Sequence, residues 1–442
     1  MCISSAVEVK ANDTWISKAL SACLPANEEA NLAAMRKNAA EALSSARVPS
    51  SRVDEAYRFT DVLPIFQSKI VAPGSSAPAP DLTAFEFSEA STTRVVLVDG
   101  VFRPELSDLS GLPEGVTAGA LSALEFSDQL AVQSDARGGV FSQFNSACAP
   151  DVFAITIAKG VHVDVPIHLL QLSTTASSAD TMSTSNPRII VTLGAGSTLE
   201  VVEEFAGLED GPCFTNAVLE AALGESSTLK HGLIQNQVLG SFHNKSTFVS
   251  QEKQSSYQLT ECELGGKLSR HDLDVLQIGP ETDTKLYSFL LAGAGQLLDL
   301  HSKLHLDHPD GKSDQVHKCI VSSSSGRGVF DGNVKVERLA QRTDAQQLSR
   351  NLLLVPKATV NVKPNLQIIA DDVKCTHGCA VSDLEEEQLF YLQSRGISPA
   401  EARDMLVFSF GQEVVAGLVY SDLRSRVEKI VTQNLVRASK QE

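Results

Sequence analysis

The sequence predicts a mainly β protein, with a long core of repeated short strands and α-helical domains at its N- and C-terminal ends. Three observations predict this fold class. Runs of β-branched residues recur from residue 151 to residue 372 and are separated by short turns that contain glycine. No convincing amphipathic helix lies between these runs. Segments rich in helix-forming residues occupy both ends of the 442-residue chain.

The N-terminal domain, residues 1–150, is expected to be mostly helical and to contain a linker. Residues 27–46 are rich in Ala, Leu, Glu and Lys and lack Pro and Gly, which predicts a helix. Residues 52–66 mix charged and aromatic side chains, as a segment that docks on another surface would. Residues 71–82, VAPGSSAPAPDL, have the composition of a linker or an exposed loop.

The core domain, residues 151–380, is predicted to repeat a strand–turn–strand unit, of which residues 188–207 (RIIVTLGAGSTLEVVEEFAG) are one example. A Rossmann or TIM pattern would need crossover helices between its parallel strands, so both are excluded. A sandwich, a barrel and a β-solenoid remain. A solenoid best suits a long array of similar short strands with variable loops. The glycines that mark the turns are Gly160, Gly194, Gly224, Gly265 and Gly293.

The C-terminal domain, residues 381–442, is predicted to contain three helices. Ser382 and Glu385 have the spacing of a capping box, and Gly396 would end the first helix. Ser398 would cap the second helix, and the remaining residues form a third amphipathic pattern. Several apolar side chains of this domain need a surface to pack on: Leu389, Phe390, Met405, Leu406 and Phe408.

The overall charge restricts the possible partners. The chain has 37 Lys and Arg against 54 Asp and Glu, a formal net charge of −17. This acidic balance argues against nucleic acid or an anionic membrane surface as the main partner. No run approaches the roughly 18 apolar residues of a membrane span. The first residues lack a basic region followed by an apolar run, so no secretory signal is predicted.

The cysteines indicate a reducing compartment. In a long chain without a predicted signal peptide, scattered cysteines read as reduced thiols and not as a disulfide framework. The eight cysteines are at positions 2, 23, 148, 213, 262, 319, 375 and 379.

The main candidate site is Cys375-Thr376-His377-Gly378-Cys379. If the strand predicted before it continues, Cys375, His377 and Cys379 project from one face, because alternate strand residues do so. Thiolate and imidazole are ligands for soft and borderline metals. Three ligands rarely complete a site, so a fourth would come from elsewhere or from another subunit. The alternative is a strand end with buried thiols. The two preceding aspartates, at 371 and 372, could order the imidazole or bind iron.

Two other motifs are weaker. Residues 299–310, DLHSKLHLDHPD, fit a solvated strand over an apolar core better than a metal site built on His301 and His305. Gly311-Lys312-Ser313 ends like a phosphate-binding loop, but the first glycine of that motif would fall at Leu306. We therefore expect a plain turn at residues 309–311.

Several stretches of the chain resemble a known family. They are TDAQQLSRNLLL, KPNLQIIADDVKC with the His-Gly that follows, EEEQLFYLQSRGI, and RVDEAYRFTDV near the N-terminus. The chain closely resembles the SufB/SufD family, which serves iron–sulfur cluster assembly, and within it the SufD branch. The match is specific over roughly residues 325–420, weaker over 150–324 and slight in the first 50 residues.

The resemblance implies a right-handed parallel β-helix core flanked by the two helical domains. It implies a non-catalytic scaffold subunit of the SUF complex that pairs with a SufB-like subunit and a SufC-like ATPase. SufC would dock on the helices after the β-helix, and the two β-helices would join near their C-terminal ends. The absence of a phosphate loop agrees with energy supplied by a separate ATPase.

The resemblance also implies the roles of the candidate residues. His377, and secondarily Cys375, match the family's residues at the SufB–SufD interface, where a nascent cluster is thought to form with a cysteine of SufB. Both would be metal ligands shared with the partner chain. Cys379 stands where the family usually has a small residue, which leaves its role open. No tightly bound cofactor is implied, only a transient iron–sulfur cluster.

Two hypotheses of different classes follow. The first is the scaffold subunit, in the bacterial cytoplasm or the plastid stroma, with a homodimer as its variant when the partner is absent. The second is a stand-alone β-helix enzyme that acts on polysaccharide. Such an enzyme would be expected to have a secretion signal and an aromatic, acidic cleft, whereas aromatic residues make up 5% of this chain.

Overall fold

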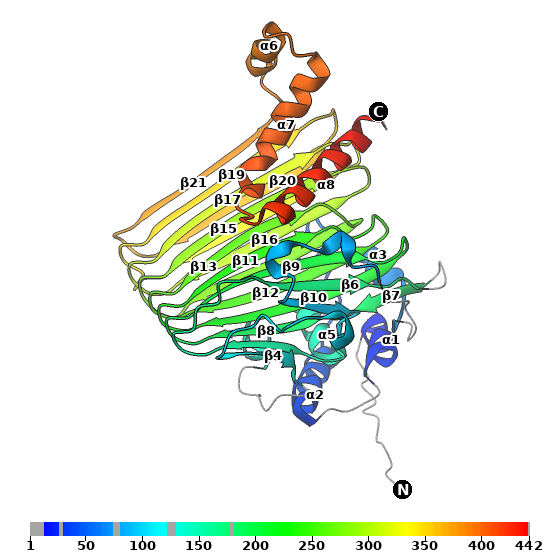
Figure 1. Cartoon of the computed structure of the whole chain (residues 1–442), viewed down its shortest axis with the longest axis vertical. Helices are drawn as coiled ribbons and strands as arrows, with labels where there is room; N and C mark the ends of the chain where they lie inside the picture. Colours follow the sequence, from blue (N-terminus) through cyan, green and yellow to red (C-terminus); the bar gives the residue numbers. More distant parts are fainter. Residues whose placement is uncertain (1–12, 26–29, 74–79, 122–129, 177–180, 441–442) are drawn as a thin grey trace.

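The core of the computed structural model is a parallel β-solenoid (Figure 1). From β8 (Arg188–Leu193) to β21 (Lys374–Ser382), successive strands alternate between two sheets, so each of these coils adds one strand to each sheet. This confirms the mainly β class and selects the solenoid from the three architectures that the sequence left open. The predicted linker falls partly on residues 74–79, which lie outside the described part of the chain. The structure describes residues 13–25, 30–73, 80–121, 130–176 and 181–440.

The first sheet has eleven strands among the described residues, and the second has ten. Apart from the antiparallel pairs β2–β3 and β4–β5, the paired strands are parallel. The first sheet consists of β1 (Lys69–Val71), β4 (Val116–Ala120), β5 (Phe153–Ile157), β7 (Thr181–Ser185), β8 (Arg188–Leu193), β10 (Cys213–Leu223), β12 (Phe242–Gln251), β14 (Leu268–Gln277), β16 (Leu297–Leu306), β18 (Arg327–Val336) and β20 (Thr359–Ile368). The second consists of β2 (Arg94–Val98), β3 (Val101–Phe102), β6 (Ile167–Ser173), β9 (Thr198–Gly207), β11 (Thr228–Gln235), β13 (Ser256–Glu263), β15 (Asp283–Ala292), β17 (Lys312–Val321), β19 (Asp344–Leu353) and β21 (Lys374–Ser382).

Stacked turns explain the recurring glycines. All five predicted turn glycines lie in connections between successive strands, as expected. A Cβ on Gly224 would lie 2.7 Å from the backbone oxygen of Leu193, and one on Gly194 would lie 2.6 Å from the backbone nitrogen of Lys159. No side chain fits at these distances, so the coils can stack this closely only with glycine at the turn.

The solenoid extends beyond residues 151–380 at both ends. Strand β2 pairs in parallel with β6, and β4 pairs with β5, so the predicted N-terminal domain contributes strands to both sheets. At the other end, β21 continues to Ser382. The N-terminal helices are α1 (Thr14–Cys23), α2 (Ala30–Ser44), α3 (Leu63–Gln67), α4 (Val132–Arg137) and α5 (Val140–Cys148), with short 3-10 helices at Glu55–Tyr57, Thr83–Phe85, Ser88–Ala90 and Pro104–Leu106.

The N-terminal helices pack against the outside of the eleven-stranded sheet. Phe141 and Phe144 of α5 belong to one buried apolar cluster with Phe214 of β10 and Phe242 of β12. Helix α2 lies in the predicted segment 27–46. Burial of these large side chains supplies the free energy that holds the helices to the sheet.

The C-terminal helices are α6 (Glu386–Ser394), α7 (Pro399–Val415) and α8 (Ser421–Lys440). The second half of α7 and the length of α8 lie along the ten-stranded sheet, whereas α6 projects beyond it (Figure 1). At Gly411 of α7 a Cβ would lie 2.7 Å from the ring of Phe289, so the missing side chain lets this helix approach the sheet closely. In the described part of the chain, no helix combines the length and the apolar character needed to cross a membrane.

One of the two predicted caps is wrong. Ser398 forms the expected capping box with Glu401 at the start of α7. Ser382 does not cap α6, because it is the last residue of β21 and pairs with Leu352 of β19. Helix α6 starts after Glu385, whose side chain makes no capping hydrogen bond. Ser382 therefore belongs to a strand pair and not to the start of a helix, which the local sequence pattern had indicated.

Candidate functional site at the open end of the solenoid

Strand β21, which carries the candidate residues, is the last strand of the ten-stranded sheet. It pairs with β19 on one side and forms the edge of the sheet on the other. Strand β20 is likewise the edge of the eleven-stranded sheet. The last coil is therefore open along both of its edge strands, and α6 rises beside it instead of covering it (Figure 1).

The three predicted ligands lie at alternate positions of this edge strand, as expected. Cys375 pairs with Ala345, His377 with Gln347 and Cys379 with Ser349. The three β19 residues are buried. Ala345 belongs to the apolar core, and the side chain of Gln347 is hydrogen-bonded to Gln315 of the coil below. Because parallel strands in register align their side chains, the candidate residues continue this row to the open end of the solenoid.

The exposure of the three side chains differs. Cys375 is half-buried and packs against the apolar core, whereas His377 and Cys379 are exposed. Burial raises the pKa of the Cys375 thiol, and the charge of Asp344 adds to this effect. Burial also raises the pKa of Cys379. Both thiols are thus protonated at neutral pH in the isolated chain, and each would lose its proton on binding a metal.

The candidate residues do not close a metal site by themselves. They are not among the groups of three whose ligand atoms lie within 4.8 Å of one another in the described part of the chain. Alternate residues of a strand are roughly 6.5–7 Å apart, which keeps His377 away from both cysteines. Asp371 and Asp372 lie in the exposed turn before β21 and, among the described residues, neither is hydrogen-bonded to His377. The described residues therefore do not complete a metal site at this end.

The domain comparison identifies the family. Residues 174–410 match the model described as the SUF system FeS cluster assembly, SufBD core domain, and residues 17–169 match the SufBD protein N-terminal region. The chain belongs to the SufB/SufD family. It is 44% identical to "Protein ABCI7, chloroplastic" of Arabidopsis thaliana over 90% of this chain and 85% of the relative.

Bacterial members of the SufB/SufD family are also similar. An iron–sulfur cluster assembly SufBD family protein of Synechocystis is 34% identical over 97% of this chain and 98% of its own length. The iron–sulfur cluster assembly protein SufD of Escherichia coli is 29% identical over 87% of this chain and 89% of its own length. These relatives are chloroplastic and bacterial, and they support a SufD-like member of the family.

The SufD-like N-terminal segment docks on the chain's own solenoid. Arg270 of β14 donates a hydrogen bond to the backbone oxygen of Ala56 (2.9 Å), and its guanidinium lies 4.1 Å from the centre of the Tyr57 ring. Thr60 donates a hydrogen bond to the buried carboxylate of Asp299 on β16. Sequence analysis predicted a docking segment at 52–66, but it did not identify these acceptor residues on the sheet.

This docking corrects one expectation. Asp299 and His301 were expected on a solvated face, but both are buried beneath the N-terminal segment. Asp299 forms an ion pair with Arg270 (2.7 Å), and its other carboxylate oxygen lies 3.0 Å from Nε2 of His301. His301 therefore belongs to a structural network. The turn expected at residues 309–311 is present, with Asp310 in the left-handed region at φ 62°.

Proposed function

We propose that this chain is a non-catalytic scaffold subunit of a SUF complex, which joins a SufB-like subunit at the open end of its solenoid and a SufC-like ATPase at α6. The observation that carries the proposal is the edge strand β21, which carries His377 and Cys375 and pairs only with β19 among the described residues, at a solenoid end that no described segment caps. The family match removes the ground for the alternative of a polysaccharide-acting enzyme. The plastid stroma or the bacterial cytoplasm fits the origin of the relatives.

The open end has the properties of an interface between two solenoids. An edge strand presents unpaired backbone N–H and C=O groups that pair readily with another strand. Solenoids need a cap at each end, since the last coil has no neighbour to cover it. Half-buried apolar side chains of β20, including Val360, Val362 and Leu366, lie at this end. A second solenoid continuing both sheets would cover all of these groups.

This interface suits transient assembly of an iron–sulfur cluster, the cargo of the complex. Imidazole and thiolate bind iron, and ligands divided between two chains can release a finished cluster when the chains move. His377 is exposed and available to the partner, with Cys375 half-buried beside it. Cys379 is exposed on the same face and is a further thiol that the partner could reach.

We predict that Val381→Pro weakens association with the SufB-like subunit by roughly ten- to a hundredfold, because a lost edge hydrogen bond costs about 1–3 kcal/mol. The N–H of Lys374 donates to the backbone oxygen of Thr343, the residue just before β19, so by alternation the N–H of Val381 points to the free edge. Proline is tolerated at such an edge position. Size-exclusion chromatography of co-expressed subunits measures the association.

Val381→Thr is the matched control, since it keeps the N–H and the β-branched shape. Undiminished association of the Val381→Pro variant, with the threonine variant behaving identically, would contradict pairing through β21.

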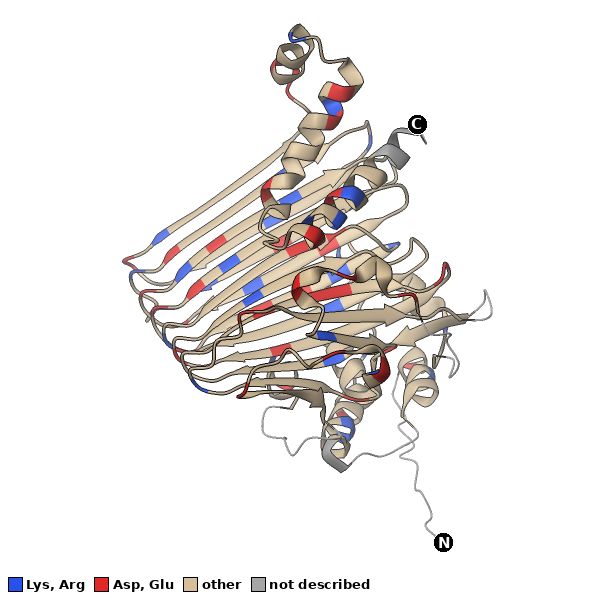
Figure 2. Ribbon diagram, viewed as in Figure 1, with Lys and Arg blue, Asp and Glu red and all other residues tan. Residues whose placement is uncertain are grey.

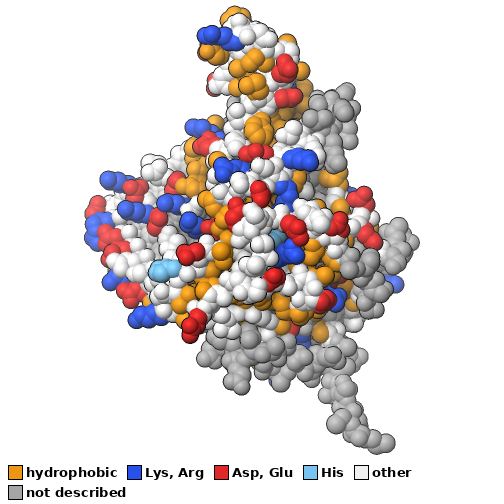
Figure 3. All heavy atoms as spheres, viewed as in Figure 1, with side chains coloured by type: hydrophobic (Ala, Val, Ile, Leu, Met, Phe, Trp, Pro, Cys, Tyr) orange, Lys and Arg blue, Asp and Glu red, His pale blue; other side chains and the backbone are white. Residues whose placement is uncertain are grey.

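Helix α6 and the start of α7 form the proposed ATPase surface. Phe390 is 73% exposed, Tyr391 is 57% exposed and Met405 is 49% exposed. In the space-filling view, hydrophobic side chains gather on this projecting part of the molecule (Figure 3). Large apolar side chains exposed together mark interaction sites. Phe390 and Met405, which the sequence indicated need a packing surface, stay exposed in the described part of the chain, whereas the neighbouring Val407 is buried against the sheet.

Phe390→Asp is expected to reduce binding of the SufC-like ATPase by about 2 kcal/mol or more, roughly thirtyfold, because an aromatic anchor becomes a charge that must be buried. A pull-down with the purified ATPase tests this expectation. Leu239→Asp is the control, because Leu239 is also exposed but lies on the β11–β12 turn. Equal retention of the ATPase by both variants would remove α6 from the interface.

A further inference from the structure

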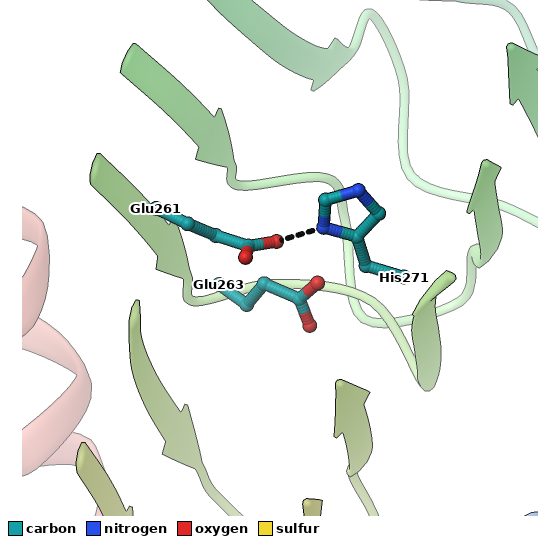
Figure 4. Close-up of side chains that lie close together, drawn as sticks. All are labelled: Glu261, Glu263 and His271. Carbon is teal, nitrogen blue, oxygen red and sulfur yellow. Dashed lines mark hydrogen bonds and ion pairs between the residues drawn. The ribbon is translucent and has the colours of Figure 1, made fainter. Parts of the chain in front are cut away.

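A second group of potential metal ligands lies inside the solenoid, away from the open end. Glu261 and Glu263 are alternate residues of β13, and His271 is on β14 of the facing sheet. All three side chains are buried. Figure 4 shows the two carboxyl groups and the imidazole ring turned toward a common space. One ligand atom from each residue lies within 4.8 Å of the other two.

The cluster has unused ligand atoms. His271 Nδ1 lies 2.7 Å from one oxygen of Glu261, and Nε2 lies 2.8 Å from the hydroxyl oxygen of Thr247. The second oxygen of Glu261 and one oxygen of Glu263 have no hydrogen-bond partner among the described residues. A buried carboxylate oxygen without a partner costs free energy, so these two atoms are open positions for a cation.

Lys245, a cation near this cluster, already forms an ion pair with a different carboxylate, that of Glu203. Lys245 lies 2.7 Å from Glu203, which also contacts His231 at 3.1 Å. Burial opposes ionisation of Glu203, but Lys245 and His231 outweigh it and lower its pKa to about 2. His317, nearby in the interior, is held neutral because burial lowers its pKa to about 3. The Glu261–Glu263 pair is thus contacted by His271, whose Nδ1 lies 2.7 Å from Glu261, and not by Lys245.

We propose that Glu261, Glu263 and His271 bind one divalent first-row metal ion inside the solenoid. Carboxylate oxygens and an imidazole nitrogen are ligands of Zn²⁺, Mn²⁺ and Fe²⁺, at bond lengths of about 2.0–2.2 Å for zinc. Two carboxylates carry a charge of −2, which one such ion neutralises, so the occupied site is suited to a dry interior.

The hydrogen bond to Thr247 determines which imidazole nitrogen binds. If Nε2–H donates to the threonine oxygen, Nδ1 faces the carboxylates and becomes available to the metal once it has lost its proton. The protons displaced from Glu263 and from Nδ1 leave to solvent, so the ion replaces protons and not another fixed charge. The enclosed position means that the ion enters as the chain folds.

The test is to refold the full chain with and without Mn²⁺ as the probe, remove free ion with a chelating resin, and measure bound manganese and thermal unfolding. We expect close to one Mn²⁺ per chain and a higher unfolding temperature for the loaded protein. Glu263→Gln, which preserves shape, should lower Mn²⁺ affinity roughly tenfold or more and lose the temperature shift. In metal-free buffer it should be at least as stable as wild type, because it removes one of two adjacent buried carboxyls.

The double variant Cys375→Ser/Cys379→Ser is the control, and it should retain manganese because the open end is not involved. His271→Gln serves as a second ligand variant if Glu263→Gln does not fold. Absence of bound manganese in the refolded wild type would overturn the proposal. Loss of manganese in the double serine variant, or its full retention in both ligand variants, would do the same.

Discussion

The His377→Ala variant is expected to fold, to assemble with its partners, and to fail in iron–sulfur cluster maturation. His377 is exposed on the edge strand, so its removal leaves no cavity and no buried partner. Its proposed role is to bind iron with ligands of the partner chain, and loss of a ligand should reduce maturation roughly tenfold or more. Maturation of a reporter iron–sulfur enzyme in cells, normalised to the amount of assembled complex, measures the effect.

Cys375→Ala should give a milder loss, because this residue is half-buried and secondary to the histidine. Thr376→Ala, on the opposite face of β21, is the matched control and should mature clusters normally. If His377 only stabilised the last coil, its alanine variant would unfold at a lower temperature and mature clusters normally per folded molecule. That outcome, or a wild-type rate in the assembled complex, would remove His377 from the site.

Arg188→Met is expected to destabilise the chain by about 3–5 kcal/mol, the cost of leaving a buried charge without its partner. The Arg188 guanidinium is buried and pairs with the carboxylate of Glu220. It also donates to Asn145 and Ser146 of α5, both at 3.0 Å, and to Ser134 of α4. This one side chain therefore connects both helices to the eleven-stranded sheet. Urea unfolding followed by circular dichroism measures the loss.

The double variant Arg188→Met/Glu220→Gln should lose less than Arg188→Met alone, because both buried charges are then removed. Arg342→Met provides the surface comparison. Arg342 pairs with Asp310 at 2.6 Å, but both are exposed, so about 1 kcal/mol or less is expected. If the Arg188 and Arg342 variants lost similar amounts of unfolding free energy, the burial of the Arg188–Glu220 pair would contribute nothing to stability.

Much of the fold follows from local sequence patterns. The glycine-marked strand units predicted a solenoid because each unit is a contiguous segment whose turns stack on themselves. The N-terminal strands β2 and β4 were missed, since each has five residues within a region that otherwise looks helical. Ser382 was misassigned because the capping pattern is local, whereas its pairing with Leu352 is set by the coil thirty residues earlier.

The candidate residues of β21 could be predicted because three potential ligands of one strand lie within five residues of sequence. The interior cluster of Glu261, Glu263 and His271 could not be predicted from the sequence. Glu261 and Glu263 occupy alternate positions, but whether a strand's alternate face points inward depends on its register in the sheet. His271 comes from the facing sheet, and the Arg270–Asp299 ion pair links two adjacent coils. The colours on the ribbon in Figure 2 show charged residues distributed over the stacked strands, where only the coiling brings residues of different coils together.

Hydrogen–deuterium exchange of the peptide 374–382 tests most directly whether β21 is the interface of the scaffold. In the isolated chain the N–H groups of Cys375, His377, Cys379 and Val381 point to a free edge, so they should exchange rapidly. In the complex with SufB-like and SufC-like subunits these amides should become strongly protected, because each would donate to the partner strand. Unchanged exchange of this peptide in an assembled complex would contradict the account.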